Sequence, residues 1–224
     1  MIRGLILDFD GLILDTEMPM RTSWMEIYEA AGVKVNDQVW ASLLGTSADP
    51  PGAYALLEEH LGQPVNRKNL HERRMRRELQ LLAEESPLPG VRSMIASSKE
   101  RGLLLAVASS SDRSWVVNHL RNHGLLDAFD AVVSADDVKQ TKPAPDLYVG
   151  ALTRLGLLPE EALAFEDSEH GVAAAKAAGL YCVAVPNRVT LCLSFEQADL
   201  VVNSLDEMDL HGYIQAAEAS RQAG

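Results

Sequence analysis

Short apolar segments recur along the chain, and polar residues followed by a stretch of helical spacing separate them. The first, Gly4–Asp8, is apolar without alternation, as strands buried on both faces of a parallel sheet are. The later segments of this kind are Leu103–Ala108, Ala131–Val133, Ala162–Phe165, Tyr181–Val185 and Leu200–Val202. Glycines at 124, 156 and 179 are expected to end the intervening helices. The pattern predicts an α/β fold, a doubly wound, Rossmann-like parallel sheet with right-handed crossovers.

Residues 16–85 depart from this pattern, because they contain no convincing strand. Trp24, Ile27 and Tyr28 lie at helical spacing, and the Pro50-Pro51-Gly52 turn separates shorter helices. We therefore expect two domains, an α/β core of residues 1–15 and 86–224 and an inserted all-helical cap of residues 16–85. The proline-containing linker of residues 86–90 is a plausible hinge for a cap that opens and closes.

Composition narrows the class of protein. The chain has 224 residues and a formal net charge of −12, which argues against a nucleic-acid partner because phosphate contacts need a basic surface. The early acidic residues do not suit a signal peptide, and no apolar run is long enough to span a bilayer. The two cysteines form no CxxC motif. We expect a cytoplasmic monomer without a membrane partner.

Polar side chains follow four of the predicted strands at the point where each strand ends. Asp8 and Asp10 follow the first, Ser109 the second, a loop reaching Lys142 the third, and Glu166-Asp167 the fourth. Ligands of open α/β sheets bind beyond the carboxyl ends of the strands, so we expect these residues at one edge. Each residue alone is weak evidence, since Ser109 could cap a helix and Lys142 could be a surface lysine. The ordered set is much more specific.

Carboxylates and a lysine in one place suit the chemistry of phosphate esters. A carboxylate that approaches a phosphate dianion to ~4 Å meets a repulsion of about 4 kcal/mol per charge pair at an effective dielectric of ~20. A nucleophilic carboxylate therefore needs a cation beside it. Asp8, Asp10 and Asp167 offer the hard oxygen ligands that Mg²⁺ prefers, and Lys142 adds a second positive charge.

These motifs resemble those of the haloacid dehalogenase superfamily. The matching residues are Asp8-Phe9-Asp10-Gly11, Ser109, Lys142-Pro143-Ala144-Pro145-Asp146 and Glu166-Asp167-Ser168. Their order and spacing match over essentially the whole chain, and the helical insert resembles the cap of the branch that contains β-phosphoglucomutase and many sugar-phosphate phosphatases. The resemblance implies a Mg²⁺-dependent phosphatase that forms an aspartyl-phosphate and acts on a small phosphorylated metabolite.

The resemblance also implies a role for each matching residue. Asp8 is the expected nucleophile, and Asp10 the general acid and base, which also offers its backbone carbonyl to the metal while its side chain stays free. The expected catalytic residues are Asp8, Asp10, Ser109 and Lys142; the substrate-binding residues Ser109, Ser110, Lys142 and Glu17; and the metal-binding residues Asp8, Asp10, Glu166 and Asp167. We expect Glu166 to orient the metal's ligands from their outer side.

Other functions remain open at this stage. A phosphosugar mutase is disfavoured because Met20 stands where that branch carries a histidine, and the loop of residues 45–50 lacks an expected arginine. A dehalogenase would need neither Mg²⁺ nor Asp10. The alternative of another class is a catalytically silent module that binds phosphoryl groups. His119 and His123 are interpreted as part of a solvated helix face. The arginines at positions 73, 74, 76 and 77 are interpreted as a salt-bridged surface, although one of these arginines could contact substrate.

Overall fold

The computed structural model describes residues 1–36, 39–40, 51–191 and 193–222, and these divide into two compact units. The sheet unit consists of Met1–Asp15 and Ser86–Gly224, and the helical unit of Thr16–Glu85. Among the residues that the structure describes, no helix combines the length and apolar character needed to cross a membrane.

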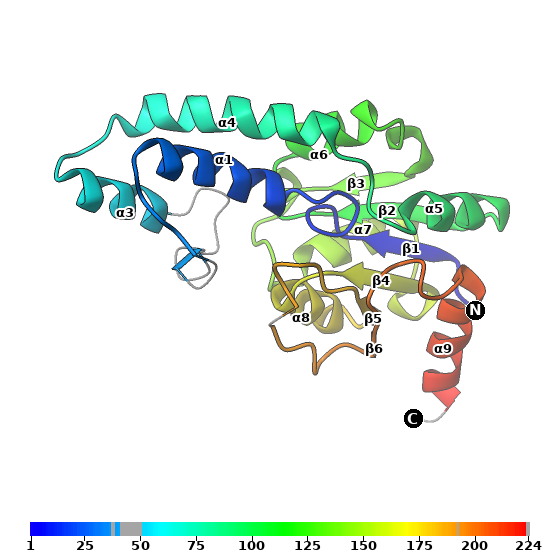
Figure 1. The fold of residues 1–224 in the computed structure, drawn as a ribbon. Helices are drawn as coiled ribbons and strands as arrows, with labels where there is room; N and C mark the ends of the chain where they lie inside the picture. The colour runs from blue at the N-terminus through cyan, green and yellow to red at the C-terminus, as the bar shows by residue number, and fades with distance from the viewer. Residues whose placement is uncertain (37–38, 41–50, 192, 223–224) are drawn as a thin grey trace. The chain divides into compact units, whose positions relative to one another are not determined.

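Six parallel strands form the sheet, in the order β3-β2-β1-β4-β5-β6 (Figure 1). This confirms the predicted doubly wound α/β fold. The strands are β1 (Gly4–Leu7), β2 (Leu104–Ala108), β3 (Ala131–Val133), β4 (Ala162–Glu166), β5 (Tyr181–Ala184) and β6 (Leu200–Val201). Their bounds differ from the predicted ones by at most one residue at either end. The chain runs outward from β1 through β2 to β3 and then returns to the other side of β1 at β4.

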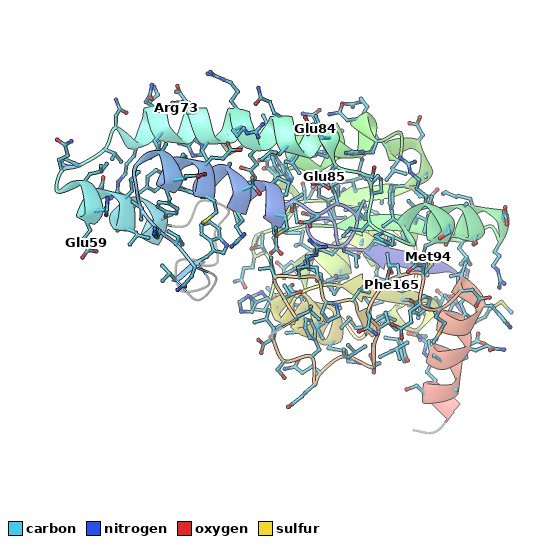
Figure 2. The ribbon with its side chains drawn as sticks, viewed as in Figure 1. Glu59, Arg73, Glu84, Glu85, Met94 and Phe165 are labelled. Carbon is cyan, nitrogen blue, oxygen red and sulfur yellow. The ribbon has the colours of Figure 1, made fainter. Side chains whose placement is uncertain are left out.

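Helices cover both faces of the sheet, because alternate residues of each strand point to opposite faces. On one face, Ile6, Ala106 and Ala164 pack with the buried side of α7 (Asp146–Leu155) and with α8 (Glu169–Ala177). On β4, Phe165 lies one residue further along, so it points to the opposite face (Figure 2). There its ring meets Tyr213 of α9 (Leu210–Gln222) edge to face at 5.2 Å.

The remaining elements of the sheet unit are short connections and two more helices. These are α5 (Val91–Glu100), α6 (Arg113–Asn122), and the 3-10 turns η1 (Leu126–Ala128), η2 (Ala135–Asp137) and η3 (Pro159–Glu161). Side chains cap two helices of the sheet unit: Asp112 accepts a hydrogen bond from the Trp115 amide at the start of α6, and Ser168 accepts one from the Gly171 amide in α8. These caps fix where the polar loops give way to helix at the carboxyl edge of the sheet.

The helical unit contains α1 (Glu17–Ala30), α3 (Pro51–Leu61) and α4 (Arg67–Glu84), and its described residues form no strand. Its core is aromatic. Trp24 is fully buried and stacks on Tyr28 at 5.7 Å, while Tyr54 meets the Trp24 ring edge-on at 4.9 Å. The Tyr28 hydroxyl donates to the Ala53 carbonyl oxygen at 2.9 Å, which ties α1 to α3. The aromatic spacing of α1 therefore builds a core of its own for this unit.

Candidate functional site

The candidate site lies at the carboxyl edge of the sheet, where the connections on the two sides of β1 diverge. β1 pairs with β2 on one side and with β4 on the other, so the residues after these three strands are neighbours. Asp8 follows β1 directly, Ser109 follows β2, and Glu166 and Asp167 stand at the end of β4. The topology therefore places three of the four predicted strand ends side by side.

A buried ion-pair cluster joins the third strand end to the others. The Lys142 ammonium lies 2.5 Å from Asp8 Oδ1 and 2.6 Å from Glu166 Oε1, and its side chain is only 6% exposed. The hydroxyl of Tyr148, on α7, also donates to Glu166 Oε1 at 2.5 Å, and the Tyr148 ring lies beneath the ammonium group at 5.5 Å. Sequence reasoning did not find Tyr148, because nothing in its local pattern distinguishes it from a core residue.

Three buried carboxylates lie close together at this site, and two of them contact Lys142. One oxygen each of Asp8, Glu166 and Asp167 lies within 4.8 Å of the others. Burial, and after it the negative charge of Glu166, raises the pKa of Asp8 to about 7, although Lys142 opposes the shift. Such an excess of buried negative charge calls for a further cation. Hard carboxylate oxygens at this spacing fit Mg²⁺, so the residues suit the metal that the motifs imply.

Asn187 holds the Asp167 carboxylate. Its amide nitrogen donates to Asp167 Oδ2 at 2.7 Å and to the carbonyl oxygen of Gly11 at 3.3 Å. The Asn187 side chain is fixed in turn, since its own Oδ1 accepts from the amides of Val189 and Thr190. Asn187 follows β5, so the rule that polar residues after a strand reach the site would have found it.

The Asp10 side chain accepts three hydrogen bonds. Trp115 Nε1 donates to Oδ1 at 2.9 Å, and the hydroxyls of Ser109 and Ser111 donate to Oδ2 at 3.1 and 2.7 Å. The Ser109 hydroxyl is fully buried and accepts from the Ser111 amide. Ser111, in the loop after β2, and Trp115, on α6, were not predicted as site residues, because both reach Asp10 from about a hundred positions away.

The two remaining substrate-binding predictions are not joined to this cluster by the described contacts. Ser110 is exposed beyond β2 and donates no side-chain hydrogen bond to the described residues. Glu17 begins α1 in the helical unit, so it is placed only within that unit. The loop of residues 45–50, which bears on the mutase alternative, lies outside the described residues.

The interpretation of the histidines and arginines needs correction. His119 does not lie on a solvated face but is buried, 4.4 Å from the Trp115 ring and 6.2 Å from Phe9. Burial lowers its pKa, which favours the neutral imidazole. Arg74 is likewise buried, where it pairs with Glu78 at 2.5 Å and lies over Trp24. The interpretation as a surface ion pair holds for Arg77, which pairs with the partly exposed Glu26.

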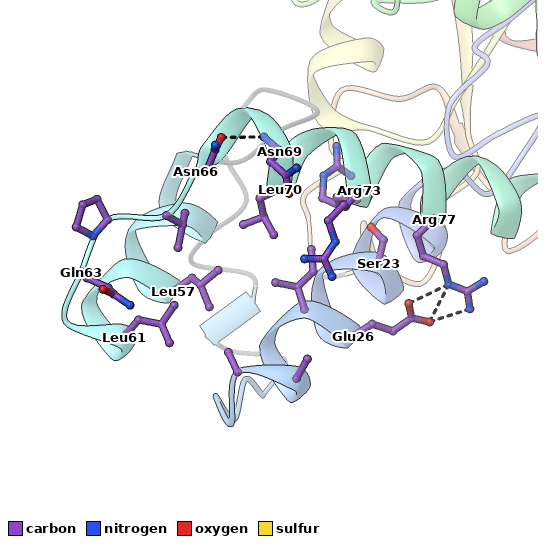
Figure 3. Close-up of a pocket in the computed structure, with 16 residues that line it drawn as sticks. Ser23, Glu26, Leu57, Leu61, Gln63, Asn66, Asn69, Leu70, Arg73 and Arg77 are labelled. Atoms are coloured by element: carbon purple, nitrogen blue, oxygen red, sulfur yellow. Dashed lines mark hydrogen bonds and ion pairs between the residues drawn. The ribbon is translucent and has the colours of Figure 1, made fainter.

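The helical unit also contains a groove of about 690 Å³ (Figure 3). Its apolar lining includes Ile27, Leu57 and Leu70, and Arg73 and the Arg77–Glu26 pair line it as well. No candidate catalytic or metal-binding residue lines it. The groove therefore belongs to the helical unit alone.

Comparisons with known proteins agree with the fold and the motifs. Protein YhcW of Bacillus subtilis is 44% identical over 211 residues, covering 94% of this chain and 95% of that protein. Hexitol phosphatase B of Escherichia coli K12 is 32% identical over 210 residues, covering 92% and 94%. A variant of CbbY from Rhodobacter sphaeroides, solved in complex with xylulose-(1,5)bisphosphate, superposes with a TM-score of 0.76 at 32% identity, covering 95% and 99%.

A family model supplies the classification. The model of the haloacid dehalogenase-like hydrolases matches residues 5–185, a range that runs from the second residue of β1 past the end of β5 and contains every residue of the carboxylate cluster. The match takes in the helical unit and most of the sheet unit. The chain belongs to the haloacid dehalogenase-like hydrolase family.

Proposed function

We propose that this hydrolase is a Mg²⁺-dependent phosphatase that cleaves a small sugar or polyol phosphate monoester through a phosphoryl group carried on Asp8. One observation carries the proposal. The Asp8 carboxylate follows the central strand directly, touches the Lys142 ammonium, and shares its surroundings with two further carboxylates. A nucleophile, a fixed cation and a set of metal ligands thus lie within one buried cluster.

Electrostatic repulsion explains why the Asp8 nucleophile needs cations beside it. The repulsion of about 4 kcal/mol per charge pair at ~4 Å would keep an isolated carboxylate away from a phosphate dianion. Lys142 is held in place by Asp8 and Glu166, so its charge is already oriented before substrate arrives. Burial strengthens the attraction between Lys142 and a phosphate group, because a buried site screens charges less than water does.

The residues of the chain supply the bond-making and proton-transfer steps. An Asp8 oxygen attacks phosphorus, the bond from phosphorus to the ester oxygen breaks, and Asp10 gives its proton to the departing alkoxide. A water molecule then attacks the same phosphorus, Asp10 takes the proton of that water, and the Asp8 carboxylate and inorganic phosphate are released. Asp10 is half-buried and lies two residues beyond Asp8, so one residue can serve both proton transfers.

Asp8, Asp167 and the backbone carbonyl of Asp10 would hold the metal, with Glu166 orienting the set from outside. When bound, Mg²⁺ offsets the negative charge of the phosphoryl oxygens and of the carboxylates. Asn187 fixes Asp167 and Tyr148 fixes Glu166, so these two carboxylates already have a defined direction. The arrangement of ligands is therefore preorganised by the chain.

The proposed substrate class draws on the relatives. One relative is hexitol phosphatase B of Escherichia coli, and the CbbY variant was solved in complex with xylulose-(1,5)bisphosphate. Both are compatible with a small polar substrate whose phosphate enters the carboxylate cluster. The described site contains no feature that favours a mutase over a phosphatase. Met20, which stands where the mutase branch carries a histidine, favours a phosphatase.

The test is hydrolysis of a panel of hexose and hexitol phosphates, and of a generic aryl phosphate, by the purified protein with and without Mg²⁺. We expect phosphate release that disappears on chelation and returns with Mg²⁺. Asp8→Asn should lower turnover by at least about a thousandfold, because it removes the nucleophile's charge. Mg²⁺ should also raise the unfolding temperature, since a ligand that binds only the folded state stabilises it.

The control is Asp146→Asn, which removes an acidic residue at the start of α7, outside the carboxylate cluster. It should keep both the activity and the Mg²⁺-induced shift in unfolding temperature. Equal turnover by wild type and Asp8→Asn would overturn the proposal. So would metal-independent release of phosphate.

A further inference from the structure

The indole N–H of Trp115 donates a hydrogen bond to the candidate catalytic carboxylate of Asp10. Among the described residues, no other aromatic ring nitrogen does so. Its Nε1 lies 2.9 Å from Asp10 Oδ1. The backbone amide of the same residue is held by the Asp112 cap at 2.8 Å, in the first turn of α6. The indole is therefore fixed at a helix terminus and directed at Asp10.

Packing against His119 also holds the indole of Trp115. His119 lies one helical turn further along α6 and meets the Trp115 ring at 4.4 Å with an angle of 65° between the planes. His119 is itself buried against Phe9, the residue that precedes Asp10. The hydrogen bond and the packing thus connect Trp115 to the Asp10 segment from two sides, which restricts the indole to one orientation.

The two oxygens of Asp10 are not equivalent. A carboxylate oxygen accepts about two hydrogen bonds. Oδ2 already accepts from the hydroxyls of Ser109 and Ser111, whereas Oδ1 accepts only from Trp115 in the described structure. Oδ2 is therefore saturated, and Oδ1 keeps one lone-pair position for a proton. The donor that orients Oδ1 is the indole of Trp115.

We infer that Trp115 is a positioning residue for proton transfer by Asp10. Its indole N–H holds the Asp10 carboxyl group so that Oδ1 is the oxygen that carries the proton. The inference rests on the proposed function, because it takes Asp10 as the general acid and base. Trp115 acts through Asp10 and exchanges no proton itself. Its loss should affect the substrates that need a proton for their leaving group, and spare those that do not.

The experiment compares kcat/KM for two phosphate esters in wild type and Trp115→Phe. This ratio reports the steps up to transfer of the phosphoryl group. A hexitol phosphate has a strongly basic alkoxide leaving group, which requires a proton, whereas 2,4-dinitrophenyl phosphate has a leaving group that departs without one. Trp115→Phe keeps an aromatic ring beside His119 but lacks the N–H. We expect about a tenfold loss of kcat/KM for the hexitol phosphate and less than about a twofold loss for the aryl ester, within the range by which general acids act.

A double-mutant cycle with Asp10→Asn separates positioning from general destabilisation. If Trp115 acts through Asp10, Trp115→Phe should cause little further loss in the Asp10→Asn background. An equal loss for both esters would overturn the inference, as would no loss for either, or full additivity with Asp10→Asn. If the wild type hydrolyses both esters through Asp8 and Trp115→Phe has the same kcat/KM values, only the role of Trp115 is refuted. A wild type without Asp8-dependent turnover refutes the proposed function as well.

A second measurement does not require the tryptophan variant to fold with an intact site. The chain has three tryptophans, so three indole N–H signals are expected in a ¹⁵N-correlated spectrum of the whole protein. The signal that Trp115→Phe removes should move on Asp10→Ala, because its acceptor is lost, while the other two keep their positions. An unchanged Trp115 signal in Asp10→Ala would show that the hydrogen bond is absent in solution and would overturn the inference.

Discussion

Asp8 and Asp10 are two residues apart, yet their surroundings are very different. Asp8 is buried and pairs with a charged group, Lys142, whereas Asp10 is half-buried and accepts from the neutral donors of Ser109, Ser111 and Trp115. The burial of Asp8 and its fixed contact with Lys142 suit a nucleophile. The half-exposed position of Asp10 suits a group that exchanges protons with a leaving group and with water. Environment, rather than residue type, distinguishes the two proposed roles.

The sequence predicted which residues meet at this edge but not all of their partners. Asp8, Lys142, Glu166 and Asp167 could be found because they stand at or after the ends of three predicted strands. Trp115 could not, because its contact with Asp10 joins positions 105 apart and depends on how α6 is turned. The mistake over His119 has the same origin, since two histidines four apart look solvated when the aromatic rings that cover one of them are unknown.

Burial of His119 makes a prediction for stability against pH. Its pKa is lowered chiefly by burial and also by His123, while Asp10 acts in the opposite direction. The unfolded chain therefore takes up a proton near pH ~6.5 that the folded chain takes up only at lower pH, so stability falls as pH drops through this window. His119→Leu should reduce the fall in unfolding free energy between pH 7 and 5, as measured by urea titration without added metal.

The control for this measurement is His170→Leu, which removes an exposed histidine of the same sheet unit. It should retain the pH dependence of the wild type. An unchanged or steeper fall in His119→Leu would contradict the burial of His119 as a neutral group.

At the scale of elements, the strands and the polar residues that follow them were the most predictable features. Buried parallel strands need continuous apolar runs, and the helices that follow need polar caps, so the two signals alternate along the sequence. The helix α5 was not singled out, because Ser93, Ser97 and Ser98 dilute its apolar stripe of Val91, Met94 and Ile95. What local patterns do not encode is how closely a helix approaches a neighbouring side chain.

Gly171 is such a close approach. It lies in the first turn of α8, and a Cβ at this position would overlap the Glu166 carboxylate. An alanine in a helix is ordinarily favoured over glycine by about 1 kcal/mol. Here we expect the reverse, since Glu166 must leave Tyr148 and Lys142 to make room. Gly171→Ala should weaken Mg²⁺ binding by about tenfold, measured by isothermal titration calorimetry, and should lower the unfolding temperature.

Gly212→Ala is a matched control, because it changes a glycine in α9 whose Cβ would meet first the flexible Met208 side chain, which lies outside the carboxylate cluster. It should leave Mg²⁺ affinity at the wild-type value. Wild-type affinity in Gly171→Ala would mean that Glu166 does not depend on the glycine for its position.

At the scale of the whole molecule, the charge distribution answers a difficulty that composition raises. A chain with a net charge of −12 is a poor binder of anions unless cations are concentrated where the anion binds. At one edge the sheet unit places Lys142 against Asp8 and Glu166, and the proposed Mg²⁺ would add a second cation beside the three carboxylates. The helical unit has its own aromatic core and its own groove. We expect the helical unit to select among phosphate esters, while the sheet unit performs the chemistry.

The central claim is that the phosphoryl group passes through Asp8. The most direct measurement is rapid acid quenching of the protein during turnover of a phosphate ester labelled in its phosphoryl group, followed by peptide mapping. The account predicts label on the peptide that contains Asp8, bound through an acyl-phosphate that is cleaved by hydroxylamine, and none in Asp8→Asn. Turnover at the full rate with no labelled peptide, or label on another residue, would contradict it.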